Sequence, residues 1–148
     1  MAAGEKKTVR VLAFGTFDLL HFGHLYYLAE AKKLGTHLAV IVARDVTVKK
    51  AKGHLPINNE QHRLALVAAL KPVDEAVLGC EQEKMFECAA ALKPDVIALG
   101  YDQKPDNETV AAELSKFDCF PKIVRLKPFK EHLHKTSKIK ARIRNSEQ

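Results

Sequence analysis

The chain has no long apolar segment. None of its hydrophobic runs approaches the roughly 20 residues that a helix needs to cross a bilayer. Residues 1–7 are polar and lack an apolar core, so no secretory signal is visible and we expect a disordered tail there. Only three cysteines occur, Cys80, Cys88 and Cys119, and no two form a Cys-x-x-Cys pair. We expect these to be small helix or strand residues without a metal or redox role, in a protein of the reducing cytoplasm.

The chain also has no linker and no low-complexity stretch that would divide it. Its 148 residues are enough for one domain with one core, and a hydrophobic fraction of 47% is ordinary for a globular protein. We therefore expect a single domain over residues 1–148.

Charged residues are unevenly distributed. The formal net charge is +6, and residues 122–144 contain nine basic residues and one acid, Glu131. A second basic cluster comprises Lys49, Lys50 and Lys52. Nucleic-acid binding would favour aromatics among the basic residues for base stacking, and the tail contains only Phe129. We expect both clusters to belong to a nucleotide site, and we expect neither nucleic acid nor a membrane as a partner.

Apolar periodicity alternates between two patterns along the chain. Short apolar runs at residues 9–14, 38–43, 75–78, 96–99 and 123–126 predict strands. Helical patterns lie at residues 21–34, 59–70, 81–92 and 107–117, with a last helix from about 137 to 144. Strands that alternate with helices of this length indicate a parallel sheet covered on both faces. We predict one doubly wound, Rossmann-like α/β domain with a five-stranded parallel sheet, whose ligands bind beyond the carboxyl ends of the strands.

The most informative segment runs from Gly15 to His24, between the first strand and the first helix. His21 and His24 are three residues apart and share one face of the first helical turn. A glycine turn followed by a helix N-terminus offers backbone amides and a positive dipole to a phosphate. Two imidazoles placed there can stabilise charge that grows on a triphosphate. The plainer alternative is a capped helix with two surface histidines.

This ten-residue block resembles the His-x-Gly-His signature of the cytidylyltransferase-like nucleotidyltransferase superfamily. The resemblance implies that His21 and His24 are catalytic and contact the nucleotide phosphates. It also implies nucleotide contacts from Gly15, Thr16, Phe17, Asp18 and Gly23. For Asp18 three roles stay open, namely capping the helix, orienting a histidine or approaching a metal.

Two further basic positions are implied by the same resemblance. A lysine in the segment after the second strand would reach phosphates, and we favour Lys49 as catalytic, with Lys52 second as an acceptor ligand. Arg63 matches an arginine that binds the phosphate of the acceptor substrate. The alternatives are a solvated basic turn and a surface arginine.

Two later segments complete the expected site. After the fourth strand, Gly100, Asp102 and Gln103 would contact the base or ribose, although glycerol-phosphate cytidylyltransferases usually carry Gly-Asp-Asp-Trp there. At the start of the last helix, Thr136 and Ser137 would bind nucleotide and Lys138 would be catalytic, with a simple helix cap as the alternative. The Arg-Thr-Glu-Gly stretch that usually precedes this motif is missing, and Lys127, Lys130 or His132 are open substitutes.

Segments 42–48, 52–57, 69–79 and 99–103 resemble archaeal FAD synthases, and the similarity extends over about residues 8–140. It implies transfer of AMP from ATP to FMN with release of pyrophosphate, assisted by a divalent cation such as Mg²⁺ bound with the phosphates, because no all-protein metal cage is visible. Two alternatives stay open: CTP-dependent activation of glycerol 3-phosphate or a similar phosphoalcohol, and a non-catalytic nucleotide- or RNA-binding module. A homodimer also stays open, because dimers are common in the superfamily.

Overall fold

The computed structural model describes residues 7–129 and 136–146, without the side chains of residues 82, 136–139 and 146. Residues 1–6, which include most of the expected tail, lie outside it, as do 130–135 and 147–148. In chain order the elements are β1 (Arg10–Gly15), α1 (Phe22–Lys32), β2 (His37–Val42), α2 (Asp45–Lys52), α3 (Glu60–Ala68), β3 (Glu75–Leu78), the 3₁₀ turn η1 (Gln82–Lys84), α4 (Met85–Ala91), β4 (Val96–Leu99), α5 (Asn107–Ser115), β5 (Lys122–Arg125) and α7 (Thr136–Ser146).

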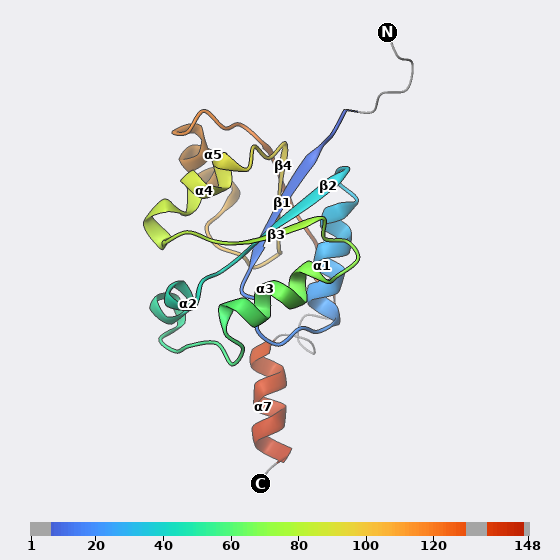
Figure 1. Ribbon diagram of the computed structural model, residues 1–148, viewed down its shortest axis with the longest axis vertical. Helices are drawn as coiled ribbons and strands as arrows, with labels where there is room; N and C mark the ends of the chain where they lie inside the picture. Colours follow the sequence, from blue (N-terminus) through green and yellow to red (C-terminus); the bar gives the residue numbers. More distant parts are fainter. Residues whose placement is uncertain (1–6, 130–135, 147–148) are drawn as a thin grey trace.

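The five strands form one parallel sheet in the order β3-β2-β1-β4-β5. The strand order reverses at β1, because the chain adds β2 and β3 on one side and β4 and β5 on the other. This topology confirms the predicted doubly wound α/β fold. Figure 1 shows that α7 projects beyond the end of the sheet opposite the N-terminus. That end carries the carboxyl termini of the strands, where ligands bind in such folds.

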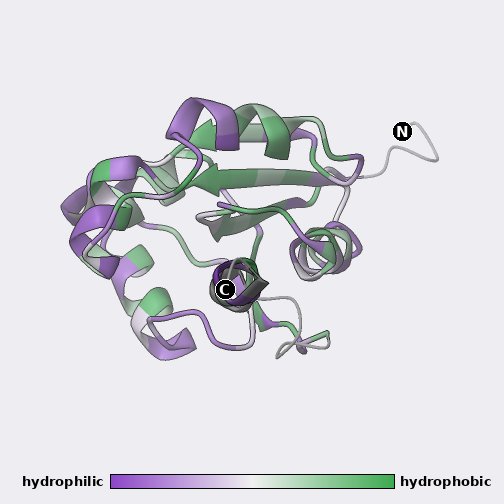
Figure 2. Cartoon of the chain, turned by 90° about the horizontal axis from the view of Figure 1, so that it is seen from below, coloured by the Kyte–Doolittle hydropathy of each residue, from purple (hydrophilic) through white to green (hydrophobic). Residues whose placement is uncertain are grey.

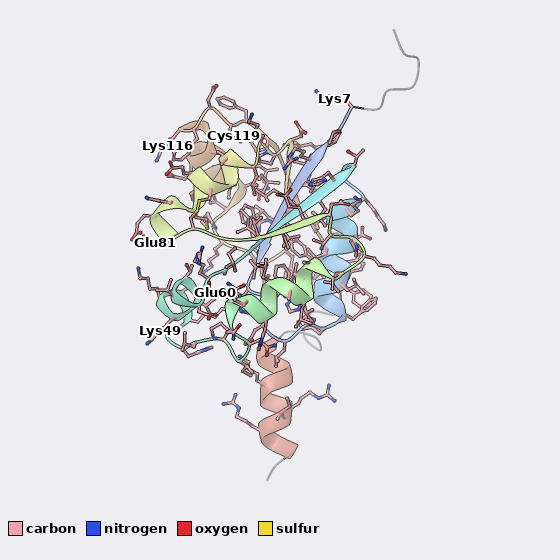
Figure 3. All side chains as sticks on the ribbon, in the orientation of Figure 1. Lys7, Lys49, Glu60, Glu81, Lys116 and Cys119 are labelled. Carbon is pink, nitrogen blue, oxygen red and sulfur yellow. A yellow bond between two sulfur atoms is a disulfide. The ribbon has the colours of Figure 1, made fainter. Side chains whose placement is uncertain are left out.

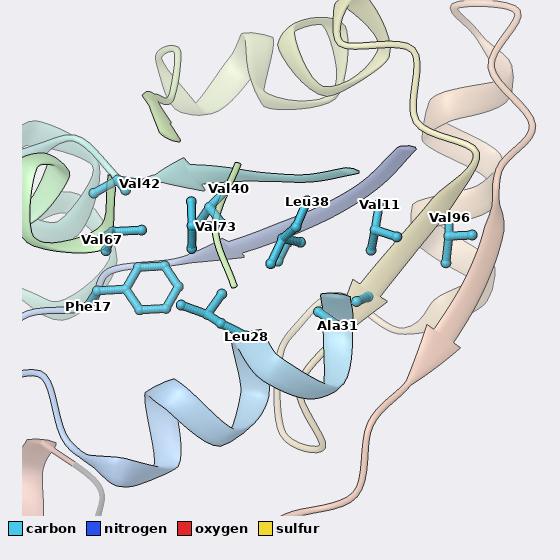
Figure 4. Packing of buried hydrophobic residues seen from close by; sticks show 12 residues of the cluster. Val11, Phe17, Leu28, Ala31, Leu38, Val40, Val42, Val67, Val73 and Val96 are labelled. Carbon is cyan, nitrogen blue, oxygen red and sulfur yellow. The ribbon is translucent and has the colours of Figure 1, made fainter. Parts of the chain in front are cut away.

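Helices cover both faces of the sheet, and each face has its own hydrophobic core. On one face α1 and α3 bury Leu28, Ala31 and Val67 against the sheet, and Phe17 joins the same cluster (Figure 4). On the other face α4 and α5 bury Ala89 and Leu114. Figure 2 shows the hydrophobic strands enclosed between these helices. Burial of each large aliphatic side chain contributes about 1.5–3 kcal/mol, so the two cores fix the sheet edge on which the site is built.

Most predicted elements occur within one or two residues of their expected bounds, and β3 and β4 coincide with them. One exception is the helix expected at residues 81–92, where the turn η1 precedes α4 at Met85, and another lies beside the site. Helix α2 was not expected, because Val46, Thr47 and Val48 favour strands over helices and the rest of the segment is basic. Its first residue, Asp45, and the first residue of α3, Glu60, each accept a hydrogen bond from the other's backbone amide. This tertiary contact stabilises a helix that local propensity does not predict.

The expectation that all three cysteines are separate small residues is wrong for two of them. Cys80, just after β3, forms a disulfide with Cys88 in α4. Cys119 is free and buried, and burial raises the pKa of its thiol. The pairing brings together residues eight positions apart, across the short turn η1, where the sequence carries no recognised motif. Within the described part of the chain, none of the helices combines the length and the apolar character that crossing a bilayer requires.

Candidate active site

A cavity of about 620 Å³ opens at the carboxyl ends of β1 and β4, the point where the strand order reverses. We call it the central cavity. Its volume suits a ligand of cofactor size. Its lining comprises Phe14, Gly15, Thr16, Phe17, Asp18, His21, Gly23, His24, Tyr26, Tyr27, Val48, Lys52, His54, Pro56, Gly100, Tyr101, Asp102, Gln103, Leu126, Lys127, Pro128, Phe129, Lys140 and Arg144.

The two histidines meet at the start of α1. His21 is the N-cap residue, with extended backbone at φ −142° and ψ 174°, and His24 is the third residue of the helix. Their rings stack with centroids 3.8 Å apart and an interplanar angle of 21°. Both line the central cavity, beside backbone amides of the first helical turn. The predicted pair is therefore brought together where a bound phosphate would accept from both rings.

The electrostatic surroundings of His24 keep its ring neutral. Burial, followed by the positive charge of its neighbours His21 and Lys52, lowers the pKa of His24 to about 3, against the weaker opposing influence of Asp18. Its Nδ1 is buried and accepts no hydrogen bond from the described residues. A neutral imidazole carries one N–H donor. His24 can thus donate a hydrogen bond to an anion without first losing or gaining a proton.

The turn between β1 and α1 depends on an unusual backbone at Phe17. Phe17 has φ 55°, in the left-handed region that side-chain-bearing residues seldom adopt. Its ring is 3% exposed and packs edge-on against His24, with centroids 5.4 Å apart. A Cβ on Gly15 would lie 2.6 Å from that ring. Glycine is therefore required at position 15 to admit the Phe17 ring, a role that adds to the backbone–phosphate approach expected from the sequence.

Asp18 connects three segments of the site. Its carboxylate accepts from the amides of Ile57 and Asn58 at 2.9 and 2.8 Å, and from the ammonium of Lys140 in α7 at 2.9 Å. Although burial alone would raise it, these hydrogen bonds hold the pKa of Asp18 below its ordinary value. The helix-cap interpretation of Asp18 is wrong, because His21 occupies the cap position of α1. Asp18 instead holds α7 and the segment that precedes α3, residues 57–58, beside the cavity.

The structure distinguishes between the two lysines expected to bind phosphate. Both lysines are exposed, but Lys52 lines the central cavity at the end of α2, whereas Lys49 is outside the lining. The label of Lys49 marks the outer side of the molecule in Figure 3. The sequence offers both lysines after the second strand and does not show which way either side chain points. Because residues 45–52 form a helix, the direction of each side chain is set by its place on the helix.

Arg63 was expected to bind the phosphate of the acceptor substrate, with a surface arginine as the alternative, but the structure buries it. It has no exposed surface, and each guanidinium nitrogen donates to a protein oxygen. The partners are the carbonyls of Asn58 and Thr16, at 2.9 and 2.7 Å, and the carboxylate of Asp45 at 2.7 Å. With no exposed surface, the guanidinium is not accessible to a phosphate in this arrangement. Arg63 instead holds the turn after β1 against the starts of α2 and α3.

The segment after β4 lies in the cavity wall, as expected for Gly100, Asp102 and Gln103. Both polar atoms of the Gln103 side chain form hydrogen bonds with the backbone. The amide nitrogen donates to the Phe14 carbonyl at 2.9 Å, and the oxygen accepts from the Gly100 amide at 2.7 Å. Asp102 is exposed within the lining. The contact with a nucleotide base stays a prediction for all three.

Positive charge gathers around the central cavity. Lys52, Lys127, Lys140 and Arg144 line it, against only two acids, Asp18 and Asp102. The sequence showed the basic tail but not which of its members face the site. Lys140 and Arg144 are four residues apart on α7 and so share a face, and this spacing is the signal that could have identified them. Such a cavity suits a polyphosphate.

A family model described as Cytidylyltransferase-like matches residues 12–142. The chain belongs to the cytidylyltransferase-like family. Its relatives include an FAD synthase from Thermoplasma volcanium, 44% identical over 135 residues that cover 91% of this chain and 94% of the relative. An FAD synthase from Methanosarcina mazei is 52% identical over 123 residues, covering 82% and 79%. The chain is thus a nucleotidyltransferase, and its resemblance to archaeal FAD synthases is confirmed.

Solved structures agree with this family assignment. The lipopolysaccharide core biosynthesis protein from Thermoplasma volcanium has a TM-score of 0.79 and 46% identity, covering 83% of this chain and 99% of that one. The pantoate-beta-alanine ligase from Francisella tularensis, with 14% identity and a TM-score of 0.59, shares the fold alone. It covers 95% of this chain and 67% of that protein.

The resemblance described above also predicts a second motif at the start of the last helix. Here α7 begins at Thr136, and the side chains of Thr136, Ser137 and Lys138 lie outside the described part of the structure. Lys130 and His132, two of the open substitutes for the missing arginine, also fall outside it, whereas Lys127 lines the cavity. The roles of the three motif residues therefore stay predictions.

Nucleotidyltransferases generally use a divalent cation together with the nucleotide phosphates. Within the described residues there is no group of three or more histidine, cysteine, aspartate or glutamate side chains that could hold a metal ion. A cation at this site would accordingly take most of its ligands from the substrate phosphates and water. The carboxylate of Asp102, exposed in the cavity lining, is an oxygen ligand of the kind that Mg²⁺ accepts.

Proposed function

We propose that this chain is an FMN adenylyltransferase, an FAD synthase that transfers AMP from ATP to FMN and releases pyrophosphate. The observation that carries the proposal is the stacked pair His21 and His24 at the start of α1, inside a cavity with four basic side chains. Its relatives named FAD synthase support the choice of ATP and FMN as substrates.

The reaction needs little covalent chemistry from the protein. A phosphate oxygen of FMN attacks the α-phosphorus of ATP, one P–O bond forms, the bond to the β-phosphate breaks, and pyrophosphate leaves. The attacking phosphate monoester already carries between one and two negative charges near neutral pH, so no basic residue has to activate it. Catalysis then consists of holding the two phosphates in line and stabilising the growing negative charge.

The described residues divide these tasks by position. His21 and His24 donate to the α-phosphate and the leaving group at the start of α1. Lys52 approaches from α2, and Lys140 and Arg144 approach from α7. A Mg²⁺ ion bound with the substrate phosphates would neutralise part of their charge, and the Asp102 carboxylate in the cavity lining could help to hold it. Gly100 and Asp102 would face the nucleotide base or ribose, and Thr136, Ser137 and Lys138 would add donors at the second helix start.

The test is a pyrophosphate-release assay with identification of the product by chromatography. ATP and CTP are each combined with FMN and with glycerol 3-phosphate, in the presence of Mg²⁺. The proposal predicts FAD from ATP and FMN, and little product from the other three combinations. CDP-glycerol from CTP and glycerol 3-phosphate would contradict the proposed substrates while retaining the same phosphate-binding residues. Absence of turnover in all four combinations would contradict the proposed reaction.

A further inference from the structure

The segment from Gly100 to Asn107, which we call the base loop, is held from behind by Arg125. Arg125 is the last residue of β5 and does not line the central cavity within the described residues. A guanidinium has five N–H donors, and all five have an acceptor here. Nη1 donates to the carbonyls of Gly100 and Gln103, both at 2.7 Å. Nε and Nη2 donate to Asn107 Oδ1 at 3.1 and 2.8 Å, and Nη2 also lies 3.4 Å from the carbonyl oxygen of Pro105.

The same loop is fixed on its cavity side by a second set of contacts. The Gln103 amide spans from the Phe14 carbonyl to the Gly100 amide, and so ties the loop to the ends of β1 and β4. The Tyr27 hydroxyl donates to the Ala98 carbonyl at 2.7 Å and lies 3.3 Å from Gln103 Oε1. Burial raises the pKa of Tyr27, so this donor keeps its proton.

These two sets of contacts hold different parts of the base loop. The Gln103 and Tyr27 contacts act at one end of the base loop, whereas Arg125 joins positions along its whole length. The residues between those positions, Tyr101 and Asp102, line the cavity. Arg125 therefore determines the position of a cavity wall that it does not itself form.

We infer that Arg125 is a positioning residue for recognition of the nucleotide base, and that Asn107 is its partner in this role. The inference rests on the proposed function, in which the base loop faces the adenine of ATP. Without the guanidinium, the loop would sample conformations that do not bind the base. The apparent dissociation constant of a ligand rises in inverse proportion to the fraction of protein in the competent conformation.

The chemistry of the contact explains why lysine cannot substitute. Four acceptor groups converge on Arg125, and its planar guanidinium presents donors toward all of them at once. A lysine ammonium has three donors on one atom at the end of a flexible chain. We therefore expect Arg125→Lys to retain the positive charge but lose most of the loop-holding function.

The test compares Arg125→Met and Arg125→Lys with the wild-type protein. For each protein, kcat and the KM for ATP are measured at saturating FMN. The ratio of kcat/KM for ATP to kcat/KM for CTP then measures base preference. The expected result is a rise of about tenfold in the KM for ATP, with kcat within about threefold, because the phosphate-binding residues are untouched. Discrimination between ATP and CTP falls in the same variants. Asn107→Ala, which removes the one acceptor that receives two of the five hydrogen bonds, shifts the KM for ATP in the same direction by a smaller factor.

Arg10→Met is the matched control. Arg10 is also partly buried and donates to a backbone carbonyl, that of Leu92 at 2.9 Å, and lies 3.5 Å from the carboxylate of Glu75, at the opposite ends of the strands from the cavity. The Arg10→Met variant should have a lower melting temperature than the wild type and an unchanged KM for ATP. An Arg125→Met protein that likewise loses only thermal stability, with an unchanged KM and base preference, overturns the inference.

The two proposals fail in distinguishable ways. If wild-type protein makes FAD from ATP and FMN but the Arg125 and Asn107 variants keep its KM for ATP, only the positioning role is wrong. If the wild type uses CTP and a phosphoalcohol, the proposed function is wrong, and the KM of the same variants for CTP decides the positioning role. If Arg125→Met does not fold, Arg125→Lys and Asn107→Ala supply the same comparison.

Discussion

His24 illustrates how one residue obtains its chemistry from its position. The sequence places it near phosphates, but only the fold buries it beside a second imidazole and Lys52. Burial first, and then the charge of these neighbours, suppresses protonation in the free protein. A bound triphosphate reverses the local sign of charge and favours the imidazolium. His24 is therefore expected to be neutral before the nucleotide binds and to gain basicity afterwards.

A titration of the histidine ring resonances by NMR checks this expectation. We predict that His24 in the free protein stays neutral through pH 5, in keeping with a pKa near 3, and that ATP raises its pKa. Because the folded value lies below the ordinary 6.5, the unfolded chain binds more protons between these pH values. The His24 contribution to stability is thus complete above about pH 6.5 and decreases as the pH falls. A free-protein pKa near 6.5 would contradict this environment.

The lysines of α2 give a second prediction at the level of single residues. Lys52→Ala should lower kcat/KM by about tenfold to one-hundredfold, through loss of a charged donor to phosphate. Lys49→Ala should leave it within about twofold, since Lys49 is exposed outside the cavity lining. Steady-state kinetics on the two single variants decide between them. A larger effect at Lys49 would restore the original preference based on the sequence.

Among single residues, the sequence predicted placement correctly where the reactive side chains lie within one local strand–turn–helix pattern. The block from Gly15 to His24 sits between a strand and a helix, so local pattern was enough to bring both histidines into one site. The structural roles of Arg63 and Arg125 were not predicted, because most of their hydrogen-bond partners are distant in sequence. Nothing near Arg63 in the chain indicates that Thr16 and Asp45 will enclose it.

Helices α2 and α3 and the turn after β1 form a connected unit around Arg63. Arg44 extends this unit: it donates to the Gly79 carbonyl at 2.7 Å and pairs with Glu60 at 3.1 Å. The helix that carries Lys52 is thus held by contacts on its first turn, far from its cavity end. The sequence could not predict α2, because these stabilising contacts are tertiary.

Arg63→Met tests the structural role of this unit. The substitution leaves the partly buried carbonyls of Thr16 and Asn58 without their Arg63 donors, and we expect a loss of about 2–4 kcal/mol in the free energy of unfolding. Urea denaturation measures that loss. In the folded variant, the KM for FMN should change little. A stable Arg63→Met protein with a strongly raised KM for FMN would instead support the acceptor-phosphate role expected from the sequence.

At the scale of the whole molecule, the fold was predictable because its signal is repeated. Five apolar strand patterns alternate with helices, and each connection is long enough for a parallel crossover. The sheet order then places residues 15–24 and 100–103 at one edge, as anticipated. The Cys80–Cys88 pairing depends on three-dimensional contacts that no periodic pattern encodes. The spacing of Lys140 and Arg144 shows that they share a face of α7, but only the fold shows that this face lines the cavity. In the proposed function, this edge holds the phosphates at the start of α1 and the nucleotide base at the base loop.

The most direct measurement follows each phosphate of ATP into the products. ATP labelled at the α-phosphate and ATP labelled at the γ-phosphate are incubated separately with FMN, Mg²⁺ and the protein. We predict that the α-label appears in FAD and the γ-label in pyrophosphate, and that His21→Ala or His24→Ala slows both by about 10²–10³-fold. A flavin product that carries the γ-label, no labelled flavin product, or full rates in both histidine variants would contradict adenylyl transfer at this site.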